Sequence, residues 1–373
     1  MKRLTVFLGL LLLADPAFAV DRWNVGIIAP TSGALSTVGT RQLSVVQWWA
    51  QDINAKGGIR GRQINLIHCN DEASPEKSVT CVRDLIGRGV VLLLNASITG
   101  PILAAMPLLQ NGPVMVTPSP NVVPPANSYV FQTSPSDLEL TKAIAAYAQA
   151  NGVNHIAMVA STDASGEVGV TSAAAVFPKE GIVYKLARID LRASDASIQL
   201  ANVVSDGASL IYSNYSGGGA ATVVKSYSNF GFEHPLLVSY ANISDSFLRL
   251  VKDDMPKRLL AVGLKAAAPE LVTDAADRAH LDYFTNSYLA WKNEPVDHLS
   301  ILGLTMADFA TAVLEHVDDP ANPAAVRKYV ESNPIASVAT LHFSAQSHVG
   351  LSASDVVVLE YNKGHWEKAG PPK

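Results

Sequence analysis

The stretch NVGIIAPTSGALSTVG, residues 24–39, is the first part of the chain whose residue types and spacing could support chemistry. An apolar run at residues 25–29 predicts a strand, and the Pro, Ser, Gly and Thr after it predict a loop. Beyond the loop, apolar residues recur at helical spacing: Leu43, Val46, Trp49 and Ile53. The first backbone N–H groups of a helix lack intrahelical partners, so such a loop is a candidate anion site. Its occupant would be a nucleotide phosphate, a substrate carboxylate or nothing.

The nucleotide interpretation fails because the loop has neither a G-x-x-x-x-G-K-[ST] sequence nor the three-glycine spacing of a dinucleotide site. The glycine-rich SGGGAA at residues 216–221 is a weak signal that equally fits a flexible turn. The chain contains no G-x-S-x-G, and its histidines show no metal-ligand spacing. No residue supplies a nucleophile together with its base. We therefore predict that the protein is not an enzyme and has no catalytic residue, no metal site and no cofactor.

The N-terminus has the pattern of a secretory signal peptide, which we predict for residues 1–19. Lys2 and Arg3 precede an apolar run, and ADPAFA then offers a cleavage site that ends at Ala19. The alternative is a buried N-terminal strand or helix. No Cys follows the apolar run, which argues against a lipid-anchored mature form. We expect a periplasmic protein whose mature chain begins near Val20.

The composition gives no sign of a nucleic-acid or membrane partner. The net charge is −5, and no basic run or Lys/Arg patch with interleaved aromatics is present. The longest later apolar stretch, residues 90–109, is broken by polar residues, Gly and Pro, so it predicts a strand, a loop and a helix. We expect a protein that is not membrane-embedded and that does not bind nucleic acid.

The two cysteines, Cys69 and Cys81, lie close together in the sequence. In an exported chain such a pair is most simply one disulfide, and the alternative is two separate buried thiols. Cys69 ends a predicted strand. Cys81 lies on a predicted helix that begins with Ser74 as N-cap and Pro75 at the first helical position.

Both halves of the mature chain show the same organisation. In each half, predicted strands alternate with predicted helices; the strands are NVGIIAP, GRQINLIHC, GVVLLLNAS and GPVMVTPS, then NHIAMVAS, GIVYKLARID, GASLIYSNY and HPLLVSYA. Their continuous Val, Ile and Leu runs are typical of parallel strands covered on both faces. The sequence therefore predicts an α/β fold with two doubly wound parallel sheets. After residue 265 come helices and two late strands, at residues 339–350 and 355–366, and we expect each sheet to receive part of this tail.

Parallel sheets of this type bind ligands outside the carboxyl ends of their strands. The loops at these ends are rich in Ser, Thr, Asn and Gly: residues 32–39, 97–100, 119–121, 161–166, 214–217 and 239–242. Two such domains facing each other would enclose a cleft lined by hydroxyls and backbone amides. The alternative is that these residues only form turns.

A series of segments occurs in a fixed order along the chain: VGIIAPTSGALSTVG, DINAKGGIRGR, NDEASPEKSV, VMVTPSPN, ASGEVG and FSAQSHVG with YNKGHW. In this order they resemble the type I periplasmic binding proteins of the branched-chain amino acid transporter group. The resemblance implies two lobes joined by three crossings, with lobe 1 formed by residues 20–134 and 265–340 and lobe 2 by residues 135–264 and 341–373. It also implies that the lobes close on one small ligand and deliver it to the membrane permease of an ABC transporter.

The resemblance further implies where a ligand would bind. The ligand carboxylate would be held by hydroxyls and amides at Ser97 or Thr99 and at Ser119 and Asn121, and Val38 would line the side-chain pocket. The second lobe offers polar and aromatic but uncharged residues. The expected ligand-binding residues are Val38, Ser97, Thr99, Ser119, Asn121, Ser165, Asn214, Tyr215 and Tyr240.

One departure from the family pattern bears on the ligand. Amino acid binders of this family have an acid after the last strand of the second lobe, which receives the ligand's ammonium. Here LVSYANISD offers Tyr240 and Asn242, and Asp245 comes several residues late. Because a buried ammonium without a counter-charge is costly, we expect an aromatic or hydroxylated acid first and a branched-chain amino acid second. A shift of a few residues in the correspondence would bring Asp245 into the cleft and restore an ammonium site.

These features predict an extracytoplasmic solute-binding protein that captures a small organic acid or amino acid between two lobes and delivers it to an ABC permease. The alternative is a ligand-sensing module of the same fold that regulates a partner protein. An enzyme on a doubly wound fold is a third interpretation.

Overall fold

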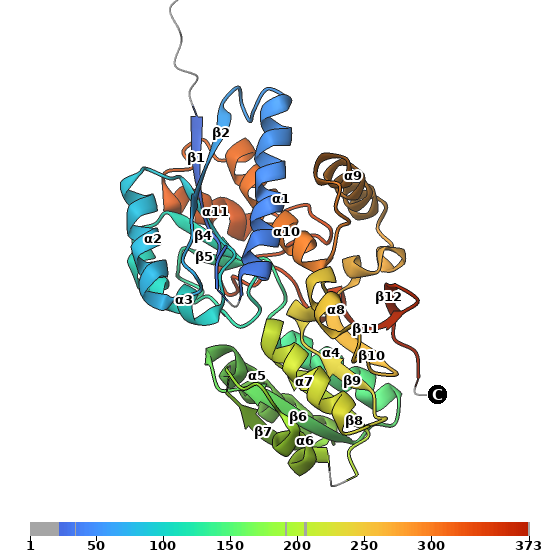
Figure 1. Ribbon diagram of the computed structural model, residues 1–373. Helices are drawn as coiled ribbons and strands as arrows, with labels where there is room; N and C mark the ends of the chain where they lie inside the picture. Colours follow the sequence, from blue (N-terminus) through green and yellow to red (C-terminus); the bar gives the residue numbers. More distant parts are fainter. Residues whose placement is uncertain (1–21, 34, 191, 205–206, 372–373) are drawn as a thin grey trace, which may run out of the picture.

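The chain forms two lobes, each built on one β-sheet with helices on both faces, in a computed structural model that describes residues 22–33, 35–190, 192–204 and 207–371 (Figure 1). This arrangement confirms the predicted α/β class with two parallel-dominated sheets. The predicted signal peptide, residues 1–19, lies outside the described residues. Within the described ranges, no helix is both long enough and apolar enough to cross a bilayer.

The first lobe contains a five-stranded, all-parallel sheet in the order β2-β1-β3-β4-β5. Its strands are β1 (Arg22–Ile28), β2 (Gln63–Cys69), β3 (Leu92–Asn95), β4 (Val114–Thr117) and β5 (Val130–Gln132). Successive side chains point to opposite faces, so Ile27 joins the apolar cluster on one side of the sheet and Ile28 the cluster on the other. Both faces are buried, which is why these strands are continuous apolar runs.

Helices from two distant parts of the chain cover this sheet. The first set is α1 (Ser36–Ala55), α2 (Pro75–Gly87) and α3 (Thr99–Ala105), and the second is α9 (Ala275–Lys292), α10 (His298–His316) and α11 (Pro323–Ser332). Helices α2 and α3 pack on one face, and α1, α10 and α11 pack on the other. The tail of the chain therefore completes the first lobe.

The second lobe contains a seven-stranded sheet in the order β12-β11-β10-β9-β8-β6-β7. Its strands are β6 (His155–Ser161), β7 (Val183–Ile189), β8 (Leu210–Asn214), β9 (Leu236–Val238), β10 (Leu259–Leu264), β11 (Val356–Asn362) and β12 (His365–Lys368). Strands β6 to β10 are parallel, and the final hairpin is antiparallel. Helices α4 (Asp137–Ala150) and α5 (Ala164–Val176) cover one face, and α6 (Ser197–Val204), α7 (Gly217–Asn229) and α8 (Asp245–Val251) cover the other.

Short 3₁₀ helices occur mainly in the connections. They are η1 (Met106–Leu109), η2 (Phe177–Glu180), η3 (Tyr240–Asn242), η4 (Lys265–Ala267), η5 (Pro269–Leu271) and η6 (Ala353–Asp355). The chain passes between the lobes between β5 and α4, again between β10 and α9, and a third time between α11 and β11.

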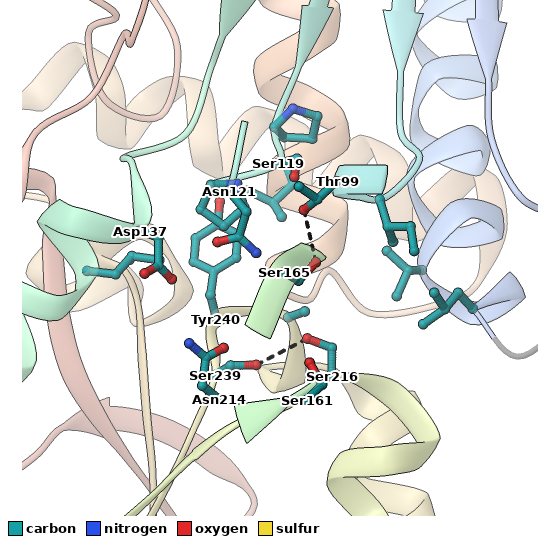
Figure 2. Close-up of a pocket in the computed structure, with 18 of the residues that line it drawn as sticks. Thr99, Ser119, Asn121, Asp137, Ser161, Ser165, Asn214, Ser216, Ser239 and Tyr240 are labelled. Carbon is teal, nitrogen blue, oxygen red and sulfur yellow. Dashed lines mark hydrogen bonds between the residues drawn. The ribbon is translucent and has the colours of Figure 1, made fainter. Parts of the chain in front are cut away.

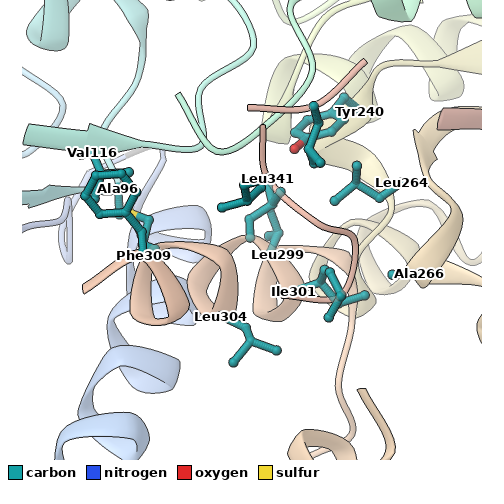
Figure 3. Packing of buried hydrophobic residues seen from close by; sticks show 14 of the residues in the cluster. Ala96, Val116, Tyr240, Leu264, Ala266, Leu299, Ile301, Leu304, Phe309 and Leu341 are labelled. Carbon is teal, nitrogen blue, oxygen red and sulfur yellow. The ribbon is translucent and has the colours of Figure 1, made fainter. Parts of the chain in front are cut away.

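Helix α10 joins the cores of the two lobes. Its Phe309 packs against Phe131 of β5, with ring centroids 5.7 Å apart. Near the other end of the helix, Leu299 and Ile301 belong to the same buried cluster as Leu264 of β10, and Figure 3 shows Leu299 on the side of α10 that faces Tyr240 and Leu264. One apolar cluster therefore runs from the first sheet through α10 to the second.

One expectation for the tail is wrong and another is confirmed. Residues 339–350 form no named strand; Leu341, Ser344 and Val349 make only isolated bridges. Strands β11 and β12 join the second sheet, and Val349 forms a parallel bridge with Gln132 of β5, so each sheet receives part of the tail, as expected. The segment contains Ser344 and Ser347, whose side chains accept hydrogen bonds from nearby backbone N–H groups and so favour a turn over an extended strand.

The predicted disulfide is confirmed. Cys69 at the end of β2 is bonded to Cys81 in α2, with Cα atoms 5.7 Å apart. Ser74 caps α2 by accepting a hydrogen bond from the Lys77 N–H, and Pro75 occupies the first helical position. The covalent link fixes α2 to the edge strand of the first sheet.

Candidate functional site

A cavity of about 110 Å³ lies between the two lobes, at the carboxyl ends of the parallel strands of both sheets (Figure 2). The first lobe contributes Leu35, Val38, Gln42, Ser97, Ile98, Thr99, Pro118, Ser119, Pro120, Asn121, Leu299 and Leu302. The crossing and the second lobe contribute Asp137, Leu140, Ser161, Asp163, Ser165, Tyr212, Asn214, Ser216, Ser239, Tyr240, Ala241 and Val262. A volume of this order holds one small organic molecule or several waters.

All the residues expected to bind a ligand except Tyr215 line this cavity. Ser97 and Thr99 follow β3, and Ser119 and Asn121 follow β4. The others are Val38 from the first turn of α1, Ser165 from the first turn of α5, Asn214 at the end of β8 and Tyr240 after β9. The rule that ligands bind beyond the carboxyl ends of parallel strands thus leads to one place in the molecule. That these side chains bind a ligand stays a prediction.

Tyr215 lies away from the cavity. Its hydroxyl donates to the carbonyl oxygen of Asp190 at 2.6 Å, and its ring packs so closely on α7 that a Cβ on Gly219 would lie 1.5 Å from it. Side chains alternate along a strand, so Asn214 and Ser216 face the cavity. Tyr215 between them packs into the apolar cluster under α6, α7 and α8, on the other face of the second sheet.

The two lobes touch across the cavity through Thr99 and Ser165. Their hydroxyl oxygens are 2.9 Å apart and share a hydrogen bond between the starts of α3 and α5 (Figure 2). On the second-lobe side, the hydroxyls of Ser216 and Ser239 are 3.3 Å apart. The contact between Thr99 and Ser165 makes the described arrangement a closed one, and hydroxyl groups lie on both walls of the cavity.

Several buried polar atoms of the cavity lining make no hydrogen bond of ordinary geometry within the described part of the chain. They are Gln42 Oε1, Ser97 Oγ, Asn121 Oδ1, Asp137 Oδ2, Asn214 Nδ2 and Tyr240 OH. Buried polar groups are normally paired, and an unpaired group costs free energy. A small molecule with matching donors and acceptors would supply these partners.

Asp137 is the most notable residue that the sequence analysis missed. It is the first residue of α4, directly after the N-cap Ser136, and its side chain is buried, with only 5 % of the residue exposed. Burial raises the pKa of its carboxyl from 3.8 to about 6, while the hydroxyls of Ser172 and Thr141 act in the opposite direction. The only sequence signal was an acid in the first turn of a helix, which normally indicates an exposed group.

Asp163, the second carboxylate of the lining, has local partners. It caps α5 by accepting a hydrogen bond from the Gly166 N–H at 3.0 Å, and it also accepts one from the Ser161 hydroxyl. Together with Asp137 it shows that the expectation of an uncharged lining outside the first lobe is wrong.

Asp245 does not line the cavity. It lies at the start of α8 beside a separate surface cleft that also contains Arg41, Arg249 and Asp297. Burial and Asp297 raise the pKa of its carboxyl, and Arg41 and Arg249 lower it. The described geometry therefore gives Asp245 no contact with a molecule in the cavity between the lobes.

Tyr240 and His298 form a neutral wall behind the cavity. Their rings are perpendicular, with centroids 4.4 Å apart, and His298 Nε2 accepts a hydrogen bond from the Leu264 N–H at 3.2 Å. Burial lowers the pKa of His298 to about 3 and raises the pKa of Tyr240 well above its usual range, so neither residue is charged at neutral pH. His298 thus connects a cavity residue to the end of β10, where the chain returns to the first lobe.

Among the described residues, no group of three or more His, Cys, Asp or Glu side chains is placed to hold a metal ion. The cavity lining consists of hydroxyls, amides, two carboxylates and apolar side chains. This set can recognise a small polar molecule by hydrogen bonds and shape.

Comparison with known proteins gives a family match over most of the chain. A family model described as "Periplasmic binding protein" matches residues 22–365. The Leu/Ile/Val-binding protein homolog 3 of Brucella melitensis is 26 % identical over 132 residues, 34 % of this chain and 36 % of that protein. The Leu/Ile/Val-binding protein BraC3 of Rhizobium johnstonii is 27 % identical over 155 residues, 40 % of this chain and 42 % of that protein. The chain thus matches about two fifths of the length of these relatives.

Solved structures share the fold over nearly the whole chain. The Rhodopseudomonas palustris protein Rp1789 superposes with a TM-score of 0.83 at 17 % identity and covers 94 % of this chain and 100 % of its own. Two ABC transporter solute-binding proteins from R. palustris each cover 94 % of this chain and 96 % of their own. The one in complex with benzoate has a TM-score of 0.76 at 20 % identity, and the one in complex with 4-hydroxybenzoate 0.78 at 17 %. At these identities the likeness concerns the fold alone.

Proposed function

The chain belongs to the type I periplasmic binding proteins of the branched-chain amino acid-binding family, and from this premise we propose that it captures a small organic acid or amino acid and delivers it to the permease of an ABC transporter. Members of this family are solute-binding proteins, not enzymes, and they work outside the cytoplasm. The proposal includes export through the signal peptide at residues 1–19, with cleavage near Ala19.

The observation that carries the proposal is the cavity between the lobes with its unpaired buried polar atoms. Ser97, Thr99, Ser119 and the neighbouring backbone amides form a set of donors suited to a carboxylate. Asn214 Nδ2 and Tyr240 OH add two neutral donors from the second lobe. Hydrogen bonds from neutral donors to a buried carboxylate stabilise its charge without an opposing ion.

The names of similar proteins support this ligand class. The curated relatives are Leu/Ile/Val-binding proteins, and two of the structurally similar proteins hold benzoate and 4-hydroxybenzoate. Each of these ligands has one carboxylate on a small apolar body. Such a molecule fits a cavity with polar groups at the strand ends and Val38, Leu140, Leu299 and Leu302 among its apolar lining.

A binding screen tests the proposal directly. The mature protein would be titrated with amino acids, aromatic acids, short dicarboxylates and amides, and the melting temperature recorded, because a ligand that binds only the folded state raises it. We expect carboxylic acids to give the largest shifts. A shift by the amides equal to that of the acids would contradict the assignment of the carboxylate site.

The donors of the first lobe give the matched mutational test. Thr99→Val keeps the size of the threonine side chain and Ser119→Ala adds no atom, and together they remove both hydroxyls, so binding of the best acid should fall by at least two orders of magnitude. Thr80→Val is a suitable control, because Thr80 is exposed on α2 with its hydroxyl bonded to the Glu76 carbonyl, away from the cavity. Unchanged affinity in the double variant would exclude these hydroxyls as carboxylate donors.

A further inference from the structure

Asp137 and Asp163 both line the cavity, but only Asp163 is explained by the local structure. Asp163 caps α5 and accepts hydrogen bonds from the Gly166 N–H and the Ser161 hydroxyl. Asp137 has one carboxylate oxygen, Oδ2, that is buried and makes no hydrogen bond of ordinary geometry within the described residues. The fold therefore places at the cavity an acceptor that no described donor meets with ordinary hydrogen-bond geometry, although the hydroxyls of Ser172 and Thr141 lower the pKa of the carboxyl.

The helix end does not account for Asp137. An acid in the first turn of α4 is favoured by the helix dipole, but Ser136 already caps this helix and Glu139 already supplies a partly exposed first-turn acid. The pKa of the Asp137 carboxyl is raised despite its place at the helix end, so burial outweighs any benefit from the dipole. A partly exposed acid such as Glu139 would interact equally well with the helix dipole without the free-energy cost of burying a carboxylate.

No positive charge among the described residues compensates this carboxylate. No ion pair between described residues involves Asp137, and the cavity lining contains no Lys, Arg or His. The groups that face it are neutral: Tyr212 of β8, whose own pKa is raised by burial and by Asp137, the hydroxyls of Ser172 and Thr141, and the phenol of Tyr240 across the cavity. A ligand that brought only a carboxylate would place a second negative charge in the same small space.

Resting on the proposed function, we infer that the ligand is a carboxylic acid that also carries a protic group, an ammonium or a hydroxyl, and that this group donates a hydrogen bond to Asp137 Oδ2. The ligand carboxylate then meets the neutral donors of Ser97, Thr99 and Ser119, and the protic group lies toward α4. Asp137 thus selects amino acids or hydroxy acids over plain acids of the same shape. Asp245 is not needed for this selection.

Matched pairs of acids test the inference. Dissociation constants would be measured by calorimetry at pH 7 for leucine against 4-methylpentanoate, which lacks the ammonium, and for 4-hydroxybenzoate against benzoate, which lacks the hydroxyl. We expect the wild type to prefer the protic member of at least one pair by about tenfold or more. In Asp137→Ala that preference should fall to within about threefold, because no acceptor remains.

Asp137→Asn separates the two sources of the protic group. The amide still accepts a hydrogen bond but has no charge, so a preference for a hydroxyl should largely persist and a preference for an ammonium should be lost. Asp245→Asn is the matched control and should leave every preference unchanged. Both Asp137 variants remove a buried charge, so their circular dichroism and ligand-free melting temperatures should not fall, and this verifies folding.

The failures are distinguishable. Equal affinity within both pairs in the wild type, or a preference that survives in Asp137→Ala, overturns the inference while the proposed function stands, because carboxylic acids still bind. Failure of every carboxylic acid in the wider screen overturns the proposed function and the inference with it.

Discussion

At the scale of single residues, the strand-end rule locates the cavity, and the alternation of side chains selects which residues reach it. Asn214, Tyr215 and Ser216 are consecutive, yet only the first and the last line the cavity. The sequence shows an aromatic residue after a strand but does not show which face it occupies, because the end of β8 is set by pairing with β6 and β9. A one-residue error in the predicted end of β8 would place each of these side chains on the opposite face of the sheet.

Asp137 was missed for a different reason. It follows β5, a strand of three residues that the sequence analysis did not predict, so its loop was not counted among the strand ends. Its neighbours Ser136 and Glu139 give the ordinary signal of a helix start, in which acids are usually exposed. Its burial comes from α5 and β8, elements far along the chain, and no local pattern records it.

Asp137 makes the stability of the ligand-free protein depend on pH. Its pKa is higher in the folded chain, about 6, than the usual 3.8, so its contribution to stability is full below about pH 4 and is lost as the pH rises through 6. Asp137→Asn does not titrate. The ligand-free variant should therefore match the wild type at pH 4 and exceed its free energy of unfolding at pH 7 by up to roughly 3 kcal/mol.

Urea unfolding at the two pH values, without ligand, measures this effect. The pH 4 comparison is the internal control, because a protonated carboxyl and an amide are alike in size and charge. A variant that is less stable than the wild type at pH 7 would show that the carboxylate stabilises the fold, and the case for a ligand partner would weaken.

At the scale of elements, the contact between α5 and β8 shapes the cavity. Gly169 in α5 is buried, and a Cβ at this position would lie 1.4 Å from Asn214 Nδ2. The glycine therefore leaves room for the Asn214 side chain in the cavity wall. A helix interior otherwise disfavours glycine by about 1 kcal/mol relative to alanine, so the position serves packing and not helix formation.

Gly169→Ala should therefore weaken binding. The added methyl must displace the Asn214 side chain, which removes a donor and narrows the cavity, so we expect at least a tenfold loss of affinity for the best acid and a lower melting temperature. Gly218→Ala in α7 is the matched control, because a Cβ there would meet no heavy atom within 4 Å. It should leave affinity unchanged. Equal affinity of the two variants would show that Asn214 does not contribute to the site.

The same scale shows how far the sequence predicts the fold. Strands such as β3 and β4 are short runs of buried apolar residues between turn-forming segments, and these were predicted. Strand β10 is equally buried but was missed, since it follows the basic segment at residues 257–258 and precedes a crossing instead of a helix. Residues 339–350 show the opposite error, because their alternation of apolar and polar residues resembles a strand while their backbone makes local turns and isolated bridges. Whether β10 and residues 339–350 form strands is decided by pairing with distant parts of the chain, which the local sequence does not show.

At the scale of the whole molecule, the lobes are both separate and connected. Each has its own sheet, yet α10 belongs to an apolar cluster that contains residues of both, and the chain passes between them three times. Across the cavity the contact is smaller and polar, through Thr99 and Ser165. A packed connection on one side and a hydrogen-bonded contact on the other allow rotation about the crossings, which would open the cavity.

The hydroxyl contact gives a way to lock the molecule closed. The Thr99 and Ser165 oxygens are 2.9 Å apart, so cysteines at both positions would place two sulfur atoms close enough for a disulfide between the lobes. Without ligand, we expect the wild type to open and its radius of gyration by small-angle X-ray scattering to exceed that of the oxidised Thr99→Cys, Ser165→Cys variant. Saturating ligand should bring the wild-type scattering curve to that of the locked variant.

The oxidised variant should also exchange ligand at least a hundredfold more slowly than the wild type, because the cavity opens only when the lobes separate. Each single cysteine variant serves as a control for the substitution itself, and wild type given the same mild reductant controls for the disulfide between Cys69 and Cys81. Coincident scattering curves for the ligand-free wild type and the locked variant would show that the closed arrangement needs no ligand, and the proposed capture by closure would then be wrong.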